Sequence, residues 1–327
     1  MSDNRTRWGV LAPGRIARKF AEAVGGAGDA LVAVGSRSKD RADAFADEFD
    51  IPRRYDSYAA LVADPDIDAI YVSSPHPYHR DHAVLALDAG KAVLCEKPIA
   101  VNAAQARDIV AAARRNGKFA MEAMWSRFLP IVARTRALIA EGAIGAPRMV
   151  SADFGFRANV DPKGRLFDPA LGGGGLLDVG CYPVSFAHMI LGKPVEAKAL
   201  ACLGETGVDE QNVVTMKFAD GALAVTTSGV RTTTPLDAVV LGTDGRIRIH
   251  SPWFDGVALT LTRPGEEDRR IEEPRVENGF EYEVREVARC LREGLLESPV
   301  LPLDESVAIM ETLDQARAQW GLRYPME

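Results

Sequence analysis

Apolar and polar positions alternate in two different ways along this chain, and the pattern changes near residue 125. In the first part, short apolar runs with β-branched residues alternate with longer helical patterns, which indicates βαβ units and a parallel sheet. The predicted strands are residues 8–11, 30–35, 69–73, 92–95 and 119–123. The predicted helices are residues 16–24, 39–49, 79–89 and 103–116.

The second part of the chain is rich in β-like runs. Helical stretches are predicted at residues 131–141 and after the glycine run 172–175, and the β-like runs are residues 198–203, 212–218, 222–230, 238–241, 246–250 and 257–262. Asp-Gly pairs at 220–221, 244–245 and 255–256 are typical of tight turns between antiparallel strands. Helices predicted at 280–295 and 305–320 close the chain.

Chain length favours two domains, because 327 residues exceed the roughly 250 to 300 at which one core usually stops growing. We expect an α/β protein with a doubly wound parallel sheet of the Rossmann type over residues 1–124, which binds a dinucleotide. Residues 125–327 are expected to form an α+β domain with a large, mainly antiparallel open sheet, which binds substrate and forms oligomers.

Composition narrows the class of protein further. With 47% apolar and 26% charged residues the chain is typical of globular proteins, and its formal charge of −7 argues against a nucleic-acid partner. No segment reads as a signal peptide or approaches a membrane span. The four cysteines are far apart, which argues against disulfides and a zinc site. We expect a metal-free cytoplasmic protein.

A cofactor signal lies in the first predicted βα turn, where Ala12, Gly14 and Ala17 occupy the positions of a G-x-G-x-x-G/A fingerprint. Gly14 allows the backbone to approach a pyrophosphate at the helix N-terminus, and Ala17 allows the helix to pack tightly. The usual first glycine is Ala12 here, so the turn must tolerate a methyl group.

The end of the second predicted strand indicates which dinucleotide binds. NAD sites place a carboxylate there, whereas this chain has Ser36 and Arg37, with Arg41 one helical turn later. Two arginines suit the 2′-phosphate of NADP. We therefore predict NADP, with NAD as the other possibility; the alternative is a solvated arginine pair beside Asp40 and Asp43.

Lys97 is the first candidate catalytic residue. It lies in the sequence Cys95-Glu96-Lys97-Pro98, at the end of a predicted strand. Ligands of open α/β sheets bind at strand exits, although a Glu-Lys-Pro by itself also fits a surface lysine. Asp178 and Tyr182 are four residues apart at the start of a helical stretch, so they share a face. If that face meets Lys97, the ammonium would lower the phenol pKa and make Tyr182 a general base, with Asp178 orienting it.

Several motifs occur in the order expected of the Gfo/Idh/MocA oxidoreductases, which the chain resembles over nearly its whole length. The motifs are the glycine turn, residues 73–79, Glu96-Lys97-Pro98 and residues 174–182. Residues 121–128 and a tyrosine at 182 resemble the branch with dimeric dihydrodiol dehydrogenase and NADP-dependent D-xylose dehydrogenase; many members have His in place of Tyr182. The resemblance implies a Rossmann domain and a second domain whose open sheet often forms a dimer face.

Site residues follow from these motifs and from the resemblance. The predicted catalytic residues are Lys97, Tyr182 and Asp178. The predicted cofactor-binding residues are Gly14, Arg15, Ile16, Ser36, Arg37, Arg41, Ser74, Pro75, His76, His79, Glu96 and Lys97. Candidate substrate contacts are Trp125, Phe154 and Phe280, although large aromatics are more often core. No metal site is predicted, because the histidines at 76, 79 and 82 have no carboxylate partner in their motif.

Three functions stay open at this point. The first is an NADP-dependent dehydrogenase that acts on a secondary or anomeric hydroxyl of a sugar, cyclic polyol or trans-dihydrodiol. A keto-sugar reductase would use the same residues in the reverse direction. A dinucleotide-binding regulator would keep the fold without the chemistry. In each case we expect a small-molecule ligand and a homodimer or higher homo-oligomer.

Overall fold

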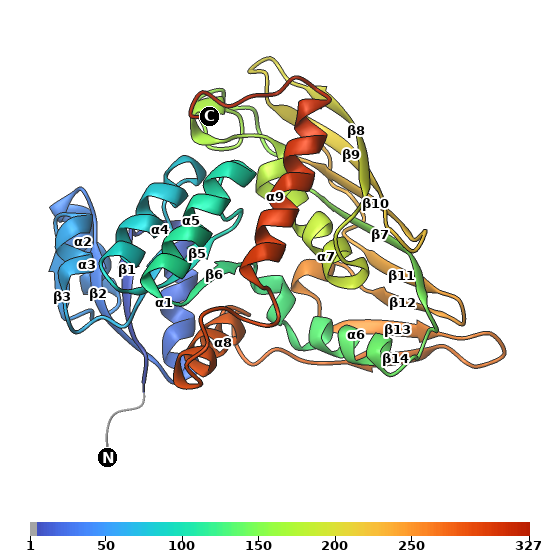
Figure 1. Ribbon diagram of the computed structural model, residues 1–327, viewed down its shortest axis with the longest axis horizontal. Coiled ribbons are helices and arrows are strands. Elements are labelled where there is room, and N and C mark those ends of the chain that lie inside the picture. Colours follow the sequence, from blue (N-terminus) through green and yellow to red (C-terminus); the bar gives the residue numbers. More distant parts are fainter. Residues whose placement is uncertain (1–4) are drawn as a thin grey trace. The chain divides into compact units, whose positions relative to one another are not determined.

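The computed structural model describes residues 5–327. These residues divide into two compact units (Figure 1). The first unit comprises the chain up to Ala100, Ala104–Trp125 and Val276–Ser306, and the second comprises Val101–Ala103, Ser126–Arg275 and Val307–Glu327. The segment Ala104–Trp125 of the first unit ends one residue after the expected boundary at residue 124. The return of Val276–Ser306 to the first unit has no counterpart in the sequence pattern.

The first unit contains a six-stranded parallel sheet in the order β3-β2-β1-β4-β5-β6, which confirms the predicted doubly wound sheet. The strand order reverses between β1 and β4, and open α/β sheets bind ligands at such a point. The strands are β1 Arg7–Leu11, β2 Ala30–Gly35, β3 Arg53–Tyr55, β4 Ala69–Val72, β5 Ala92–Glu96 and β6 Ala120–Ala123. The main helices are α1 Arg15–Ala27, α2 Lys39–Glu48, α3 Tyr58–Ala63, α4 His79–Asp88, α5 Ala103–Asn116 and α8 Glu281–Arg292.

The second unit contains an eight-stranded sheet in the order β14-β13-β12-β11-β7-β10-β9-β8. Only β7 and β10 pair in parallel among these strands, so the sheet is mainly antiparallel, as predicted. The strands are β7 Pro147–Gly155, β8 Glu196–Leu203, β9 Asp209–Lys217, β10 Leu223–Gly229, β11 Ala238–Gly242, β12 Arg246–Ile249, β13 Ala258–Thr262 and β14 Arg269–Glu272. The main helices are α6 Pro130–Ala140, the π-helix η4 Leu176–Gly180, α7 Cys181–Leu191 and α9 Leu303–Ala318.

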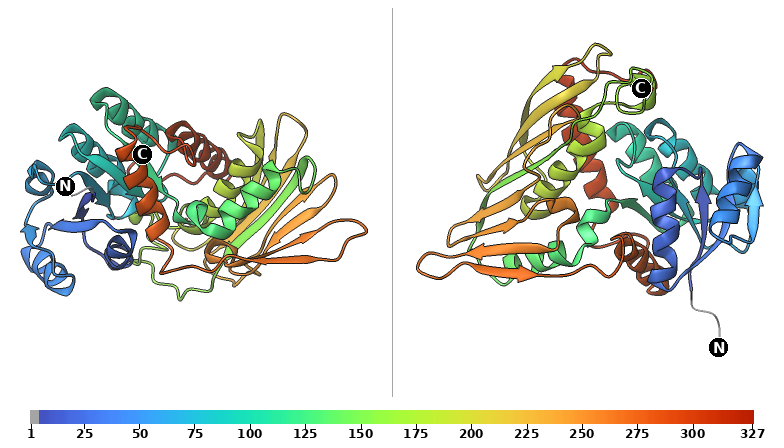
Figure 2. Two further views of the ribbon diagram at one scale, coloured as in Figure 1. Left: turned by 90° about the horizontal axis from the view of Figure 1, so that it is seen from below. Right: turned by 180° about the vertical axis from the view of Figure 1, so that it is seen from behind.

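One face of the eight-stranded sheet is covered by helices. The helix α7 packs on β7 and β10, and α6 packs on β13, while the other face carries no helix of the described residues (Figure 2). Leu200, Val213 and Leu223 on the open face are 79%, 40% and 48% exposed. Val214 and Met216 on β9 are buried on the covered side, because successive strand residues point to opposite faces.

The helical run Pro169–Leu191 corrects the expectation that no segment approaches a membrane span. By length and composition these 23 residues could cross a bilayer, but 83% of the apolar window is buried inside the fold. Burial of this kind is typical of a core helix, and α7 occupies that position between the sheet and the rest of its unit.

Candidate active site

The turn after β1 is built to receive an anion. Ala12 adopts a left-handed conformation with φ of 68°, where a glycine is usual, and its N–H donates to the Gly35 oxygen at 3.0 Å. Gly14 precedes α1 in an extended conformation without a side-chain cap, and the first turn of α1 has no acidic residue. The N–H groups of this turn therefore suit the pyrophosphate of a dinucleotide.

The exit of β2 carries cations and no carboxylate. Ser36 is buried, whereas Arg37 and Arg41 are exposed. The Arg37 guanidinium lies 5.8 Å from the centre of the Tyr78 ring. Asp43 pairs with Lys39 at 2.5 Å and with Arg54. The exposed pair Arg37 and Arg41 suits a phosphate.

His79, a predicted cofactor contact, bonds to the backbone at the exits of β4 and β5. The ring is completely buried, with Nδ1 2.8 Å from the Pro98 oxygen and Nε2 2.7 Å from the Ser74 oxygen. Burial lowers the pKa of His79 to about 4, so the neutral ring donates to one of these oxygens at a time. His79 thereby ties the β4 exit, with Ser74, Pro75 and the buried His76, to the β5 exit.

Lys97 follows β5 in a backbone held by buried polar groups. Glu96 accepts a hydrogen bond from the Tyr71 hydroxyl through Oε1 and one from the Lys97 N–H through Oε2 at 3.2 Å. The Lys97–Pro98 peptide bond is cis. Glu283, from the first turn of α8, is completely buried, and burial together with Glu96 raises its pKa well above the ordinary value. These contacts fix the strand exit on which the candidate lysine stands.

In the second unit, Asp178 lies inside the π-helix η4. Gly175 caps this helix, so Asp178 is not its cap. The Asp178 carboxylate is 6% exposed and pairs with Arg165, whose Nη1 lies 2.7 Å from Oδ1 and Nη2 3.4 Å from Oδ2. Arg165 was missed from the sequence, because no local pattern links it to a residue 13 positions later. The two-point contact holds the carboxylate in one orientation.

Tyr182, in the first turn of α7, is 7% exposed and packs among aromatic rings. Phe154 and Phe254 stack with ring centres 3.7 Å apart, and the Tyr182 ring lies 5.2 Å and 5.9 Å from them. In the first unit, Trp125 and Phe280 stack at 5.2 Å. Two of the candidate aromatic contacts, Trp125 and Phe280, thus lie in the first unit, and Phe154 lies in the second.

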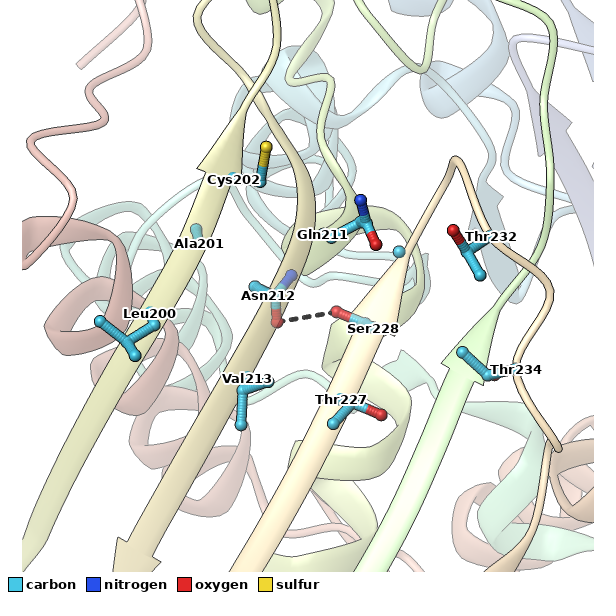
Figure 3. Close-up of a pocket in the computed structure, with 11 residues that line it drawn as sticks. Leu200, Ala201, Cys202, Gln211, Asn212, Val213, Thr227, Ser228, Thr232 and Thr234 are labelled. Atoms are coloured by element: carbon cyan, nitrogen blue, oxygen red, sulfur yellow. Dashed lines mark hydrogen bonds between the residues drawn. The ribbon is translucent and has the colours of Figure 1, made fainter.

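The hollow on the eight-stranded sheet, possible metal sites and the remaining histidines add no residues to the candidate active site. A hollow of about 390 Å³ on the open face of the eight-stranded sheet is lined by β8, β9 and β10 and contains none of the predicted site residues (Figure 3). Within residues 5–327 no three His, Cys, Asp or Glu side chains lie in an arrangement that could hold a metal ion. His188 and His250 bond to Thr312 and Thr260, as structural residues do.

Comparison with known proteins decides the family. Residues 6–124 match the model of the oxidoreductase family with an NAD-binding Rossmann fold, and residues 132–248 match the GFO/IDH/MocA C-terminal domain. A trans-1,2-dihydrobenzene-1,2-diol dehydrogenase from Xenopus tropicalis is 38% identical, covering 98% of this chain and 99% of its own. The chain belongs to the Gfo/Idh/MocA oxidoreductase family. The enzyme of the same name from Mus musculus is also 38% identical, with 98% of each chain covered.

Solved structures agree with this Gfo/Idh/MocA assignment. An aldose-aldose oxidoreductase from Caulobacter crescentus superposes with a TM-score of 0.88 at 26% identity, covering 96% of this chain and 98% of that one. A 3-ketoreductase from Actinomadura kijaniata, in complex with NADP, gives 0.85 at 26% identity over 96% and 97% of the two chains. This Gfo/Idh/MocA protein is thus an oxidoreductase of CH–OH groups with a nicotinamide cofactor.

Proposed function

We propose that this protein is an NADP-dependent dehydrogenase that acts on a secondary or anomeric hydroxyl of a sugar, cyclic polyol or trans-dihydrodiol. The observation that carries the proposal is Tyr182, a phenol held against Phe154 and Phe254 one turn after the Arg165-bound Asp178. The names of the relatives, dihydrodiol dehydrogenases at 36–38% identity, and of the aldose-aldose oxidoreductase support this substrate range.

The proposed chemistry gives each predicted catalytic residue a role. Tyr182, as phenolate, takes the proton of the substrate hydroxyl, so that the carbon–oxygen bond becomes a carbonyl as the hydride leaves. The ammonium of Lys97 favours the phenolate by its charge. Asp178 orients the phenol or the substrate hydroxyl. The nicotinamide, when bound, accepts the hydride or returns it in the reverse reaction.

A keto-sugar reductase is the second candidate, and the similarity to the NADP-bound 3-ketoreductase favours it. In that direction Tyr182 donates its proton to the carbonyl oxygen, so the same residues serve. Solved variants of the 3-ketoreductase carry a Tyr-to-Phe and a Lys-to-Ala substitution. The regulator without chemistry is not retained, because the chain belongs to an oxidoreductase family and has Lys97, Asp178 and Tyr182 together.

Three finer properties belong to the same proposal. NADP is preferred through Arg37 and Arg41, with NAD as the alternative. The protein forms a homodimer through the open face of its eight-stranded sheet. It works in the cytoplasm, where the four free cysteines would stay reduced.

Substrate screening with NADP, following absorbance of the reduced cofactor with aldoses, inositols and trans-dihydrodiols, tests the reaction class. With the substrate found, Lys97→Ala and Tyr182→Phe are each expected to lower kcat about a hundred- to ten-thousandfold, the usual contribution of a general acid or base. NADP affinity should change little, because neither variant alters the turn at Gly14.

Lys193→Ala and Tyr55→Phe are matched controls. Lys193 pairs with Glu311 on the surface of the second unit, and the Tyr55 hydroxyl donates to Asp64. Both controls should keep wild-type kcat. A Tyr182→Phe variant with near-wild-type kcat would contradict the assignment of Tyr182 as the base, and a flat response to every alcohol and ketone would contradict the proposed substrate range.

A further inference from the structure

Asp209, the first residue of β9, reaches the start of the helical run that carries Asp178 and Tyr182. Its side chain is completely buried, and its Oδ2 accepts a hydrogen bond from the Leu176 N–H at 2.7 Å. Leu176 begins η4, which continues directly into α7. A carboxylate 33 positions away in sequence therefore holds the first turn of the segment with both candidate catalytic residues.

The start of this helical run needs an acceptor from elsewhere in the fold. The first N–H groups of a helix have no partner within the helix, and Gly175 at the cap position supplies no side-chain hydrogen bond. A negative charge is also favoured at a helix N-terminus. Asp209 meets both requirements from a neighbouring strand.

The glycine run before the helix is shaped around this carboxylate. Gly174 has a φ of 114°, which side chains rarely adopt, and a Cβ atom there would lie 2.4 Å from Oδ1 of Asp209. A Cβ atom on Gly175 would lie 3.3 Å from Oδ2. Only glycine at position 174 permits both the turn and the close approach.

A second contact extends the network along the helical run. The Asn212 Nδ2 donates to Oδ2 of Asp209 at 2.8 Å. The Ser228 hydroxyl donates to Oδ1 of Asn212 at 2.9 Å (Figure 3). A Cβ atom on Gly180 would lie 2.6 Å from that hydroxyl oxygen. The network thus touches the run at its first residue and at Gly180, on either side of Asp178.

We propose that Asp209 is a positioning residue for Asp178 and Tyr182. Its carboxylate fixes the start of the helical run, and the run in turn holds the carboxylate and the phenol where proton transfer needs them. This inference rests on the proposed function for the roles of those two residues. The hydrogen bonds from Leu176 and Asn212 to Asp209, called the clamp below, are a property of the fold.

The charge of Asp209 changes near neutral pH. Burial raises its pKa to about 7, against the effect of the hydrogen bonds from Leu176 and Asn212. Tyr324 faces it from the C-terminal segment, with the Arg317 guanidinium 5.3 Å from the centre of its ring, and stays neutral because burial and Asp209 raise its pKa well above the ordinary value. The clamp is therefore anionic above about pH 7 and neutral below it.

Hydrogen exchange of the peptide that spans residues 173–182, corrected for the intrinsic rate, reports the clamp without any substrate. Asp209→Ala should raise its exchange at pH 8 at least tenfold. With the substrate, kcat should fall about a hundredfold, as for a small misplacement of reacting groups, while the NADP Kd stays within twofold. Asp209→Asn keeps an acceptor of the same shape, so it should retain most protection but lose the change in protection between pH 6 and pH 8 that is expected of wild type.

Asp314→Asn is the matched control, because Asp314 accepts the Ala103 N–H at 2.8 Å in the same unit and is not bonded to the helical run. Wild-type exchange in Asp209→Ala, or equal effects of Asp314→Asn, would overturn the proposal. If Asp209→Ala does not fold, Asn212→Ala removes one donor and should move the pH midpoint of protection upward; an unmoved midpoint contradicts the clamp. Lack of turnover in wild type with intact exchange behaviour would count against the proposed function alone.

Discussion

Replacing Arg37 and Arg41 by alanine tests the cofactor preference at the exit of β2. Both side chains are exposed at a strand end without a carboxylate, and the nearby Asp43 pairs with Lys39 and Arg54. NADP differs from NAD at this end only by the 2′-phosphate. Loss of the two guanidinium groups should therefore weaken NADP binding and leave NAD binding nearly unchanged.

The size of the effect follows from the exposure of the two arginines. A hydrogen bond to a charged group contributes about 1.5 to 3 kcal/mol. Because both side chains face solvent, the lower value applies, and two contacts give about 3 kcal/mol, or about a hundredfold in Kd. Exposed charges are also screened by salt, so the wild-type preference for NADP should shrink between 0.05 and 1 M NaCl.

Titration calorimetry of the double variant with NADP and with NAD measures both affinities directly. Arg115→Ala is a suitable control, because Arg115 forms a comparable surface pair with Asp88 on the same unit. Arg37 lies over the Tyr78 ring, so a melting curve should accompany each variant to exclude loss of that contact as the cause. Equal wild-type affinity for the two cofactors, or a parallel fall of both affinities in the double variant, would refute the assignment of these arginines.

Two further predictions concern stability and assembly. The raised pKa of Glu283 means that its stabilising contribution is present at low pH and lost as pH rises through that pKa, so Glu283→Gln should lose less stability than wild type between pH 5 and pH 9. Urea unfolding at both pH values measures this, and identical pH dependence contradicts it. Leu200→Asp on the open sheet face should turn the homodimer into a monomer by light scattering, whereas Val276→Asp, also at an exposed apolar residue, should not; a wild-type monomer at micromolar concentration excludes the dimer.

Strands and helices with a clear periodic pattern of apolar residues were predictable from the sequence. The bounds of β2 and α5 match the predictions to the residue. By contrast, β3 is the three residues Arg-Arg-Tyr and β14 is Arg-Arg-Ile-Glu, and neither has the apolar run that identifies a strand. Their strand conformation comes from pairing with a neighbour, which local sequence does not encode.

Site residues, too, were predictable only where a local motif displays them. Gly14, Lys97 and Tyr182 belong to motifs that a single stretch of sequence displays, so they were found before the structure. Arg165 and Asp209 act through contacts between distant parts of the chain, and Asp209 stands in a sequence that reads as a turn before a strand. The buried ring of His79 bonds to the backbone around the predicted cofactor site, a role that its motif alone does not show.

The arginines proposed to choose the cofactor and the aromatic neighbours of Tyr182 belong to different units of this fold. The arginines that would read the 2′-phosphate belong to the first unit, whereas the Phe154–Phe254 stack beside Tyr182 belongs entirely to the second. A change in the second group alters the shape offered to a sugar or a dihydrodiol ring without altering the turn at Gly14. Since a fold can keep its cofactor site while its substrate surface varies, relatives with different substrates are expected on this framework. The residues to compare among them are therefore the aromatic neighbours of Tyr182, because the proton chemistry needs only the phenol, the lysine and the carboxylate.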